Sequence, residues 1–122
     1  MIKSVSDLEV FKISYRLAME IFTTTRNFPR EERYSLTDQI IRSSRSVSAN
    51  VAEGWGKRIY ENEFKRHLVY ALGSLEETKT WLTFAKDCNY FPVEVFDAFN
   101  SKCDELGAKM YKLYENWKTL KQ

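Results

Sequence analysis

Apolar residues recur in steps of three and four along the last third of the chain, which is the spacing of one face of a helix. A proline at position 92 stands where the first turn of such a helix would begin. The apolar positions form a heptad pattern: Phe96, Phe99, Cys103, Leu106, Met110, Leu113, Trp117 and Leu120. The pattern predicts one long amphipathic helix whose apolar face packs into a core.

A second stretch, residues 61–88, follows the same rule. Its apolar face contains Phe64, Leu68, Ala71, Leu75, Thr78, Leu82 and Ala85. Only the short segment Asn-Tyr-Phe-Pro separates this helix from the last one. A connection of that length forces two helices into an antiparallel hairpin.

The N-terminal region predicts a third helix. Asp7 or Ser6 is a suitable N-cap, and Phe28-Pro29 marks the end because the residue before a proline disfavours helical backbone. The expected buried stripe is Leu8, Phe11, Tyr15, Ala18 and Phe22.

The remaining helix, residues 35–54, has an unusual composition. Ser35 and Asp38 resemble a capping box at its start, and Gly54 is expected to end it. The face that would pack inward combines aliphatic residues with small polar ones: Leu36, Ile40, Ile41, Ser43, Ser44, Val47, Ser48, Asn50 and Val51. Such a segment forms a helix poorly alone, so tertiary contacts must hold it. Small side chains here, with Gly73 on the following helix, favour close packing of these two helices over a subunit contact.

Four helices with short connections predict an all-α fold, an antiparallel up-down-up-down four-helix bundle, in one domain covering residues 1–122. The last two helices are longer than the first two, so one end of their hairpin should project. Aromatic and aliphatic residues gather at that end: Trp81, Phe84, Tyr90, Phe91 and Val95. Either Phe28, Pro29 and Tyr34 fold over them, or they form an association surface.

Composition adds limits on location and cross-linking. The first residues lack the apolar stretch of a secretory signal, and no run reaches the roughly 20 apolar residues of a membrane span, so we expect a cytoplasmic protein. Cys88 and Cys103 would lie about 16 Å apart along antiparallel helices, too far for a disulfide. Both are therefore expected to be small buried apolar residues.

Positive charge is concentrated in the middle of the chain, although the net charge is only +2. Residues 26–66 hold nine basic and six acidic residues. Seven of the eight arginines fall there: Arg26, Arg30, Arg33, Arg42, Arg45, Arg58 and Arg66.

Residues that could carry catalysis or hold a metal are scarce. A di-iron bundle needs Glu-x-x-His pairs, but Phe64 stands three residues before the sole histidine, His67. There is no Cys-x-x-Cys pair, phosphate-binding glycine loop or nucleophile elbow. We therefore expect no enzyme, no metal and no cofactor, with His67 at the boundary between core and surface and the adjacent acidic pairs, such as Glu31-Glu32, on solvated faces.

The segment from Asn50 to Arg58 departs from local rules. Asn50 occupies a core position, and Glu53 lies in the last helical turn, where the helix dipole disfavours a carboxylate and a compensating cation is expected. Such departures often mark functional or strained positions. Asn50, Glu53, Gly54 and Trp55 are accordingly predicted to form an oligomer contact or a structural motif; satisfying backbone groups around the Gly54 turn is the simpler alternative.

Taken together, these residues resemble the four-helix-bundle proteins encoded within intervening sequences of bacterial large-subunit ribosomal RNA genes. That family is similar to the accessory variability protein of diversity-generating retroelements. The resemblance covers nearly the whole chain and rests on residues 7–11, 28–29, 34–36, 52–54 and 71–77, together with Glu32, Gln39, Arg42, Arg45, Ser46, Asn50, Arg58, Glu63, Phe64 and Leu68. It implies a four-helix bundle that assembles as a ring, a homopentamer, with a basic surface, and the retroelement relative binds RNA and a reverse transcriptase.

Two hypotheses follow for function. In the first, the chain is an oligomeric RNA-binding module, and the contact is made by Arg42, Arg45, Lys57, Arg58, Lys65 and Arg66. Trp55 would then either stack on an unpaired base or, as we favour, seal the end of the bundle. In the second, the arginines pair with Glu53 and with acidic groups on the third helix, and the chain is an adaptor that binds only protein.

Overall fold

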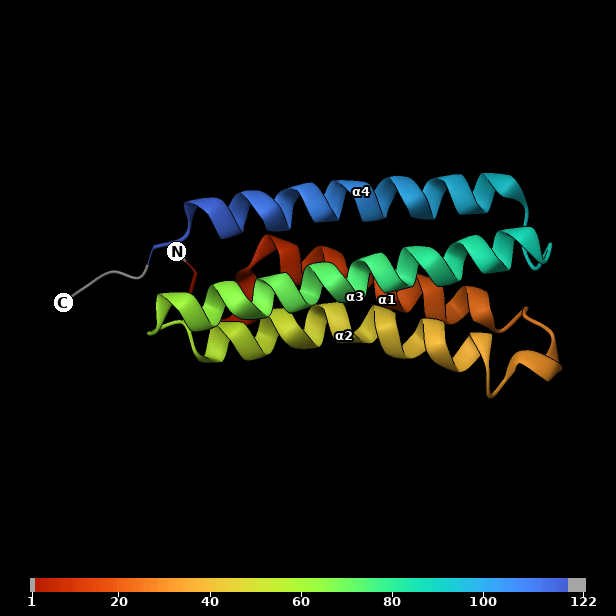
Figure 1. Cartoon of the computed structure of the whole chain (residues 1–122), viewed down its shortest axis with the longest axis horizontal. Helices are drawn as coiled ribbons and strands as arrows, with labels where there is room; N and C mark the ends of the chain where they lie inside the picture. The colour runs from red at the N-terminus through yellow and green to blue at the C-terminus, as the bar shows by residue number, and fades with distance from the viewer. Residues whose placement is uncertain (1, 119–122) are drawn as a thin grey trace.

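The computed structural model describes residues 2–118, and within them the chain forms helices and no strand. The α-helices are α1 (Glu9–Thr25), α2 (Leu36–Gly56), α3 (Glu61–Asp87) and α4 (Val93–Asn116), with short 3-10 turns η1 (Val5–Asp7) and η2 (Arg30–Glu32). Their axes run side by side with alternating direction (Figure 1). The predicted all-α, up-down-up-down bundle is confirmed.

The core lies along the predicted faces of α3 and α4. Phe64, Leu68, Ala71, Leu106 and Met110 are fully buried because each falls on the three-and-four spacing of its helix. The last part of the predicted α4 face is less buried, since Leu113 and Trp117 are only partly covered. Leu120 lies outside the described residues.

The prediction for α1 was wrong in two details. The helix begins at Glu9 after a 3-10 turn, and Asp7 caps that turn instead by accepting hydrogen bonds from the N–H groups of Lys3 and Ser4. The buried face is also rotated from the predicted stripe, because Tyr15 is 55% exposed. The residues buried on α1 are Val10, Ser14, Leu17, Ala18, Ile21 and Thr25.

Both ends of α2 also differ from prediction. Ser35 is the N-cap residue, but its hydroxyl donates to the Glu32 carboxylate and does not cap the helix. Glu32 itself accepts from the first N–H of the helix, at Leu36 (3.2 Å). At the other end the helix continues through Gly54 to Gly56, so Gly54 is a buried interior residue and not a stop.

The first loop folds over the turn between α3 and α4. The ring of Phe28 lies 5.5 Å from that of Tyr90 and 5.9 Å from that of Phe91, and the Tyr90 hydroxyl donates to Glu32 (2.6 Å). Asn89 adopts a left-handed conformation that ends α3 and turns Tyr90 toward this loop. Tyr34 takes no part in covering these rings, because it is 83% exposed.

This contact corrects the expectation for one acidic pair. Glu32 is not a solvated carboxylate: hydrogen bonds from Ser35, Tyr90 and the Leu36 N–H lower its pKa. The same ion raises the pKa of Tyr90. Glu32 therefore connects the start of α2 to the α3–α4 turn.

The two cysteines have different surroundings. Both are free thiols, as expected, and Cys103 is buried on α4. Cys88 is exposed, contrary to prediction, because it is the C-cap residue of α3 and lies where the chain leaves the core.

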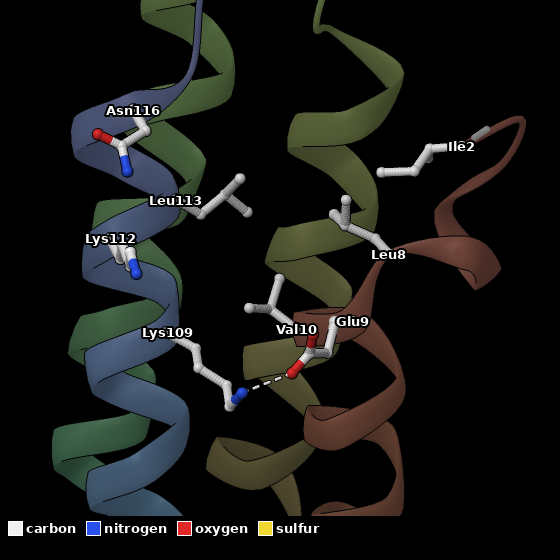
Figure 2. Close-up of a pocket in the computed structure, with 8 residues that line it drawn as sticks. All are labelled: Ile2, Leu8, Glu9, Val10, Lys109, Lys112, Leu113 and Asn116. Carbon is white, nitrogen blue, oxygen red and sulfur yellow. Dashed lines mark hydrogen bonds and ion pairs between the residues drawn. The ribbon is translucent and has the colours of Figure 1, made fainter.

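The first and last helices meet less closely than the other neighbouring pairs. A hollow of about 440 Å³ lies between the start of α1 and the end of α4, with an apolar floor that includes Leu8, Val10 and Leu113 (Figure 2). An ion pair between Lys109 and Glu9 spans it (2.6 Å). None of the described helices combines the length and apolar character needed to cross a bilayer.

The burial of each leucine predicts how much its change to Ala lowers the free energy of unfolding. Changing Leu68 or Leu106 to Ala should lower the free energy of unfolding by about 2–5 kcal/mol, because each leaves a cavity in the core. The half-buried Leu113 should lose less. Urea denaturation of the three variants tests this order, and equal small effects at all three positions would contradict the described core.

Glu32 predicts a specific dependence of stability on pH. Its folded pKa is lowered, so its contribution is fully present above the unfolded pKa and is lost as the pH falls through the folded pKa. Wild type should therefore be more stable than Glu32→Gln at neutral pH, and this difference should shrink in acid. The neighbouring Glu31→Gln variant is the control, because Glu31 is exposed. Urea midpoints measured across the acid range would contradict the assignment if both variants followed wild type.

Candidate functional site

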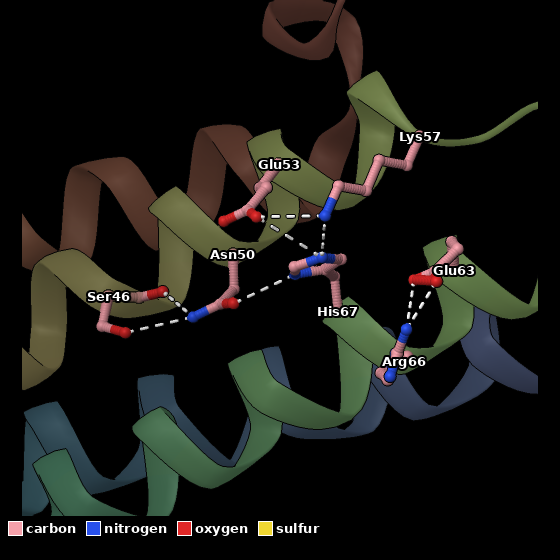
Figure 3. A network of polar contacts seen from close by, with 7 residues as sticks. All are labelled: Ser46, Asn50, Glu53, Lys57, Glu63, Arg66 and His67. Atoms are coloured by element: carbon pink, nitrogen blue, oxygen red, sulfur yellow. Dashed lines mark hydrogen bonds and ion pairs between the residues drawn. The ribbon is translucent and has the colours of Figure 1, made fainter.

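A polar network crosses the interface of α2 and α3 near the end of α2 (Figure 3). The Asn50 amide nitrogen donates to the Ser46 carbonyl (2.9 Å) and lies 3.1 Å from the Ser46 hydroxyl. The Asn50 amide oxygen faces His67 Nδ1 at 3.2 Å. Because the amide nitrogen is committed to Ser46, the oxygen is the atom left for the histidine.

The hydrogen-bond partners of the two ring nitrogens decide which nitrogen of His67 carries the hydrogen. His67 Nδ1 must carry the hydrogen that Asn50 accepts. His67 Nε2 lies 3.2 Å from Lys57 Nζ, and since an ammonium group only donates, Nε2 must accept. Each imidazole nitrogen therefore has a partner inside the protein, and His67 is only 6% exposed.

The expected cation for Glu53 is present. Lys57, one turn later on α2, lies 3.3 Å from the Glu53 carboxylate, and His67 Nε2 lies 3.6 Å from it. Glu53 is thus compensated by Lys57 on its own helix. Both Glu53 and Lys57 are exposed, so the pair contributes little to stability by itself.

Gly54 allows the two helices to approach. A Cβ atom at this position would lie 2.7 Å from the Cβ of His67, closer than real contacts allow, and 3.3 Å from Phe64. The prediction of close packing between α2 and α3 is confirmed here. It was wrong for Gly73, which is exposed and would place a Cβ in open space.

Hydroxyl groups continue this close contact along the two helices. The hydroxyl groups of Ser46 and Ser74 lie 2.9 Å apart. The Thr78 hydroxyl lies within hydrogen-bond distance of two acceptors, the Ser43 hydroxyl (2.9 Å) and the Ser74 carbonyl (2.8 Å). The buried Ser44 and Ser48 each bond to a carbonyl of the preceding turn. The buried serines of α2, Ser43, Ser44 and Ser48, therefore all have hydrogen-bond partners.

Trp55 seals the end of the bundle, which is the role that we favoured from the sequence over stacking on a base. It is 8% exposed and packs against Phe64 and Trp117, with ring centroids 6.4 Å and 6.1 Å away. The Arg58 guanidinium lies over its ring at 4.1 Å and donates to the Trp55 carbonyl (2.9 Å). With its faces covered in this way, Trp55 is not available to stack on a base.

The six predicted RNA-contacting residues fall into two groups. Three are ion-paired: Lys57 with Glu53, Lys65 with Glu61 (3.8 Å) and Arg66 with Glu63 (2.8 Å). Of the other three, Arg58 lies over the Trp55 ring, whereas Arg42 and Arg45 form no ion pair within residues 2–118. Arg42 and Arg45 are exposed on one face of α2, about two turns and one and a half turns before Asn50, the residue of α2 that contacts the His67 ring. The structure therefore separates the predicted set along α2.

Two features of this region were not predicted from the sequence: the contacts of Phe22 with arginines and the burial of His67. The guanidinium groups of Arg26 and Arg45 each lie 5.2 Å from the centre of the Phe22 ring, which joins α1 to the basic face. His67 was placed at a boundary, although it stands beside Leu68 and three residues after Phe64 on the buried face of α3. This position on the apolar face of α3 could have predicted that His67 is buried.

The described side chains offer little for bond-making chemistry. Among residues 2–118 no group of three His, Cys, Asp or Glu side chains could hold a metal ion. Burial raises the pKa of the Cys103 thiol to about 12, so it is not a nucleophile at neutral pH. Both nitrogens of His67 are engaged inside the protein.

Comparison with known proteins places these features in a wider group. Residues 6–112 match the model of a family described as 23S rRNA-intervening sequence protein. A crystal structure from Bacteroides thetaiotaomicron, of a protein with unknown function from the S23 ribosomal protein family, has the same fold. It is 23% identical, with a TM-score of 0.76, and the alignment covers 88% of this chain and 99% of that one. No curated protein matches the chain.

Gly54 and Gly73 should respond in opposite directions to the same change. Gly54→Ala forces a Cβ into His67, and overpacking of about 1–3 kcal/mol should outweigh the gain in helix propensity. Gly73→Ala meets nothing and should stabilise the protein by about 0.5–1 kcal/mol. Thermal and urea unfolding of the two variants measure this. A stabilised Gly54→Ala protein would show that α2 and α3 are not held at this distance.

Proposed function

This chain belongs to the 23S rRNA-intervening sequence protein family, and from that premise we propose that it is a non-enzymatic accessory module that binds RNA through arginines of α2. The observation that carries the proposal is the state of Arg42 and Arg45. Both are exposed, three residues apart, and neither forms an ion pair with a carboxylate of the described residues. Their charge is therefore available to phosphate groups.

The remaining predicted contacts rank below these two. Lys57, Lys65 and Arg66 would have to exchange a carboxylate partner for a phosphate, which reduces the gain from binding. Arg58 is half-buried, with its guanidinium over the Trp55 ring. These four residues extend the surface toward the start of α3 and supply secondary contacts.

Assembly of the chain with itself is the second part of the proposal. Val69 and Tyr70 are each about half exposed on α3, and Gly73 lies one turn further on the same face. An apolar face beside a residue without a side chain suits a second copy. Family resemblance suggests a homopentamer. A ring would repeat the Arg42–Arg45 surface around an axis, and avidity would then offset the low net charge of +2.

The alternative is an adaptor that binds only protein. The observation that favours it is the exposure of Ile59 (71%) and Tyr60 (66%) in the turn between α2 and α3, beside the ion-paired basic residues. Val69 and Tyr70 add further exposed apolar side chains on α3. In the RNA-binding function Arg42 and Arg45 contact RNA, whereas in the adaptor function they are structural.

The Arg42→Ala, Arg45→Ala double variant tests the RNA proposal. Wild type should bind single-stranded RNA in a salt-dependent way. The variant should bind more weakly, with a slope of log affinity against log salt reduced by roughly 0.7 for each lost phosphate contact. The Lys65→Ala, Arg66→Ala variant is the matched control and should lose less, because both side chains are paired with carboxylates.

Sedimentation of the same proteins distinguishes the alternative. The RNA proposal expects both double variants to keep the oligomer and the fold of wild type. The adaptor function is supported instead if wild type binds no RNA at low salt while loss of Arg42 and Arg45 disrupts the oligomer or the fold.

A further inference from the structure

A second basic feature lies at the opposite end of α2 from the His67 network. A hollow of about 280 Å³ is formed by the end of α1, the loop around η2 and the first turn of α2. Three arginines line it, Arg26, Arg30 and Arg33, together with Thr37. None of these residues belongs to the set predicted from sequence to contact RNA.

No carboxylate lines the hollow, although the same segment contains three. Glu32 is directed to Ser35, Tyr90 and the Leu36 N–H, as described above. Glu31 and Asp38 form no ion pair with Arg26, Arg30 or Arg33, and no other carboxylate among residues 2–118 does so. Three arginine residues thus line one space without a carboxylate partner, while the guanidinium groups of Arg26 and Arg33 lie over the rings of Phe22 and Tyr34.

Thr37 adds a buried polar group to the lining of this space. Its hydroxyl oxygen is shielded from solvent and has no hydrogen-bond partner among the described residues. A buried hydroxyl without a partner costs free energy, and such groups are rare in folded proteins. Arginine side chains are long and rotatable, so drawing their guanidinium groups onto a ligand would open a path to the hydroxyl.

We propose that this hollow binds a phosphate group in its dianionic form, through the guanidinium groups of Arg26, Arg30 and Arg33 and the hydroxyl of Thr37. Guanidinium groups match the oxygens of phosphate in charge and in planar geometry. Three of them exceed the single charge of an internal phosphodiester and suit a terminal monophosphate, which carries about −1.5 to −2 at neutral pH. The first turn of α2 adds the favourable end of its helix dipole.

The dianion has two possible sources, the end of an RNA strand and free inorganic phosphate. The RNA source rests on the proposed function, whereas binding of free phosphate does not. The first arm of the test titrates wild type with inorganic phosphate at constant ionic strength, following amide chemical shifts of residues 26–37. The second arm compares a short uridine oligoribonucleotide that carries a 5′-phosphate with the same strand ending in a 5′-hydroxyl.

Saturable shifts with inorganic phosphate are expected for wild type. The Arg30→Gln, Arg33→Gln variant should bind phosphate at least roughly tenfold more weakly. The Lys12→Gln, Arg16→Gln variant removes the same number of exposed charges from α1 and should behave as wild type. Thr37→Val keeps every charge and removes only an unpartnered hydroxyl, so it should fold normally and still lose phosphate affinity. Unchanged affinity in Thr37→Val, or equal losses in both charge variants, would overturn the site.

The oligonucleotide arm separates this inference from the proposed function. A preference for the 5′-phosphorylated strand that disappears in Arg30→Gln, Arg33→Gln but persists in Arg42→Ala, Arg45→Ala supports an RNA end as the ligand. If wild type binds both strands equally and Arg42→Ala, Arg45→Ala weakens both, the RNA surface stands and the RNA end is rejected as the source. Absence of binding in both arms overturns the inference, and absence of RNA binding alone overturns the proposed function while leaving a site for free phosphate.

Discussion

The close approach of α2 and α3 is the constraint on which the other features depend. At Gly54 the two backbones are so near that no side chain fits between Gly54 and His67. That distance brings Asn50 within reach of His67 and lets serine and threonine hydroxyls meet across the interface. A more apolar interface with larger side chains would hold the helices farther apart and leave the imidazole without its partners.

This packing also decides which charges remain available outside. At the Gly54 end, the geometry that holds His67 also places Lys57 against Glu53, and the neighbouring Lys65 and Arg66 have carboxylates on their own helix. Toward the start of α2, Arg42 and Arg45 have no such partners, and Glu32 is occupied by the turn that joins α3 to α4. The molecule is therefore polarised along α2 into a neutralised end and a basic end, a division that the net charge of +2 conceals.

Helix type and core register were predictable from sequence where the apolar spacing is long and regular, as on α3 and α4. The spacing was ambiguous on α1, where aromatic residues such as Phe11 and Tyr15 flank the buried face and were taken for it. Capping was misassigned because Glu32 lies outside the helix that it caps and is positioned by Tyr90, 58 residues away. The same reason hid the role of His67: its partners lie on another helix, and no local pattern encodes their distance.

Because the four helices pack unequally, they should separate in a defined order when the bundle opens. Helix α4 is attached to α1 across a seam held in part by exposed ion pairs of Lys109 and Lys102, whereas α2 and α3 form the most extensive contact. Partial opening would therefore release α4 while the α2–α3 hairpin stays intact. The two thiols would record that event separately, since Cys88 is accessible in the closed form and Cys103 becomes so only when α4 lifts away. The rate at which a thiol reagent modifies Cys103 would thus measure a breathing motion of the bundle, distinct from its global unfolding.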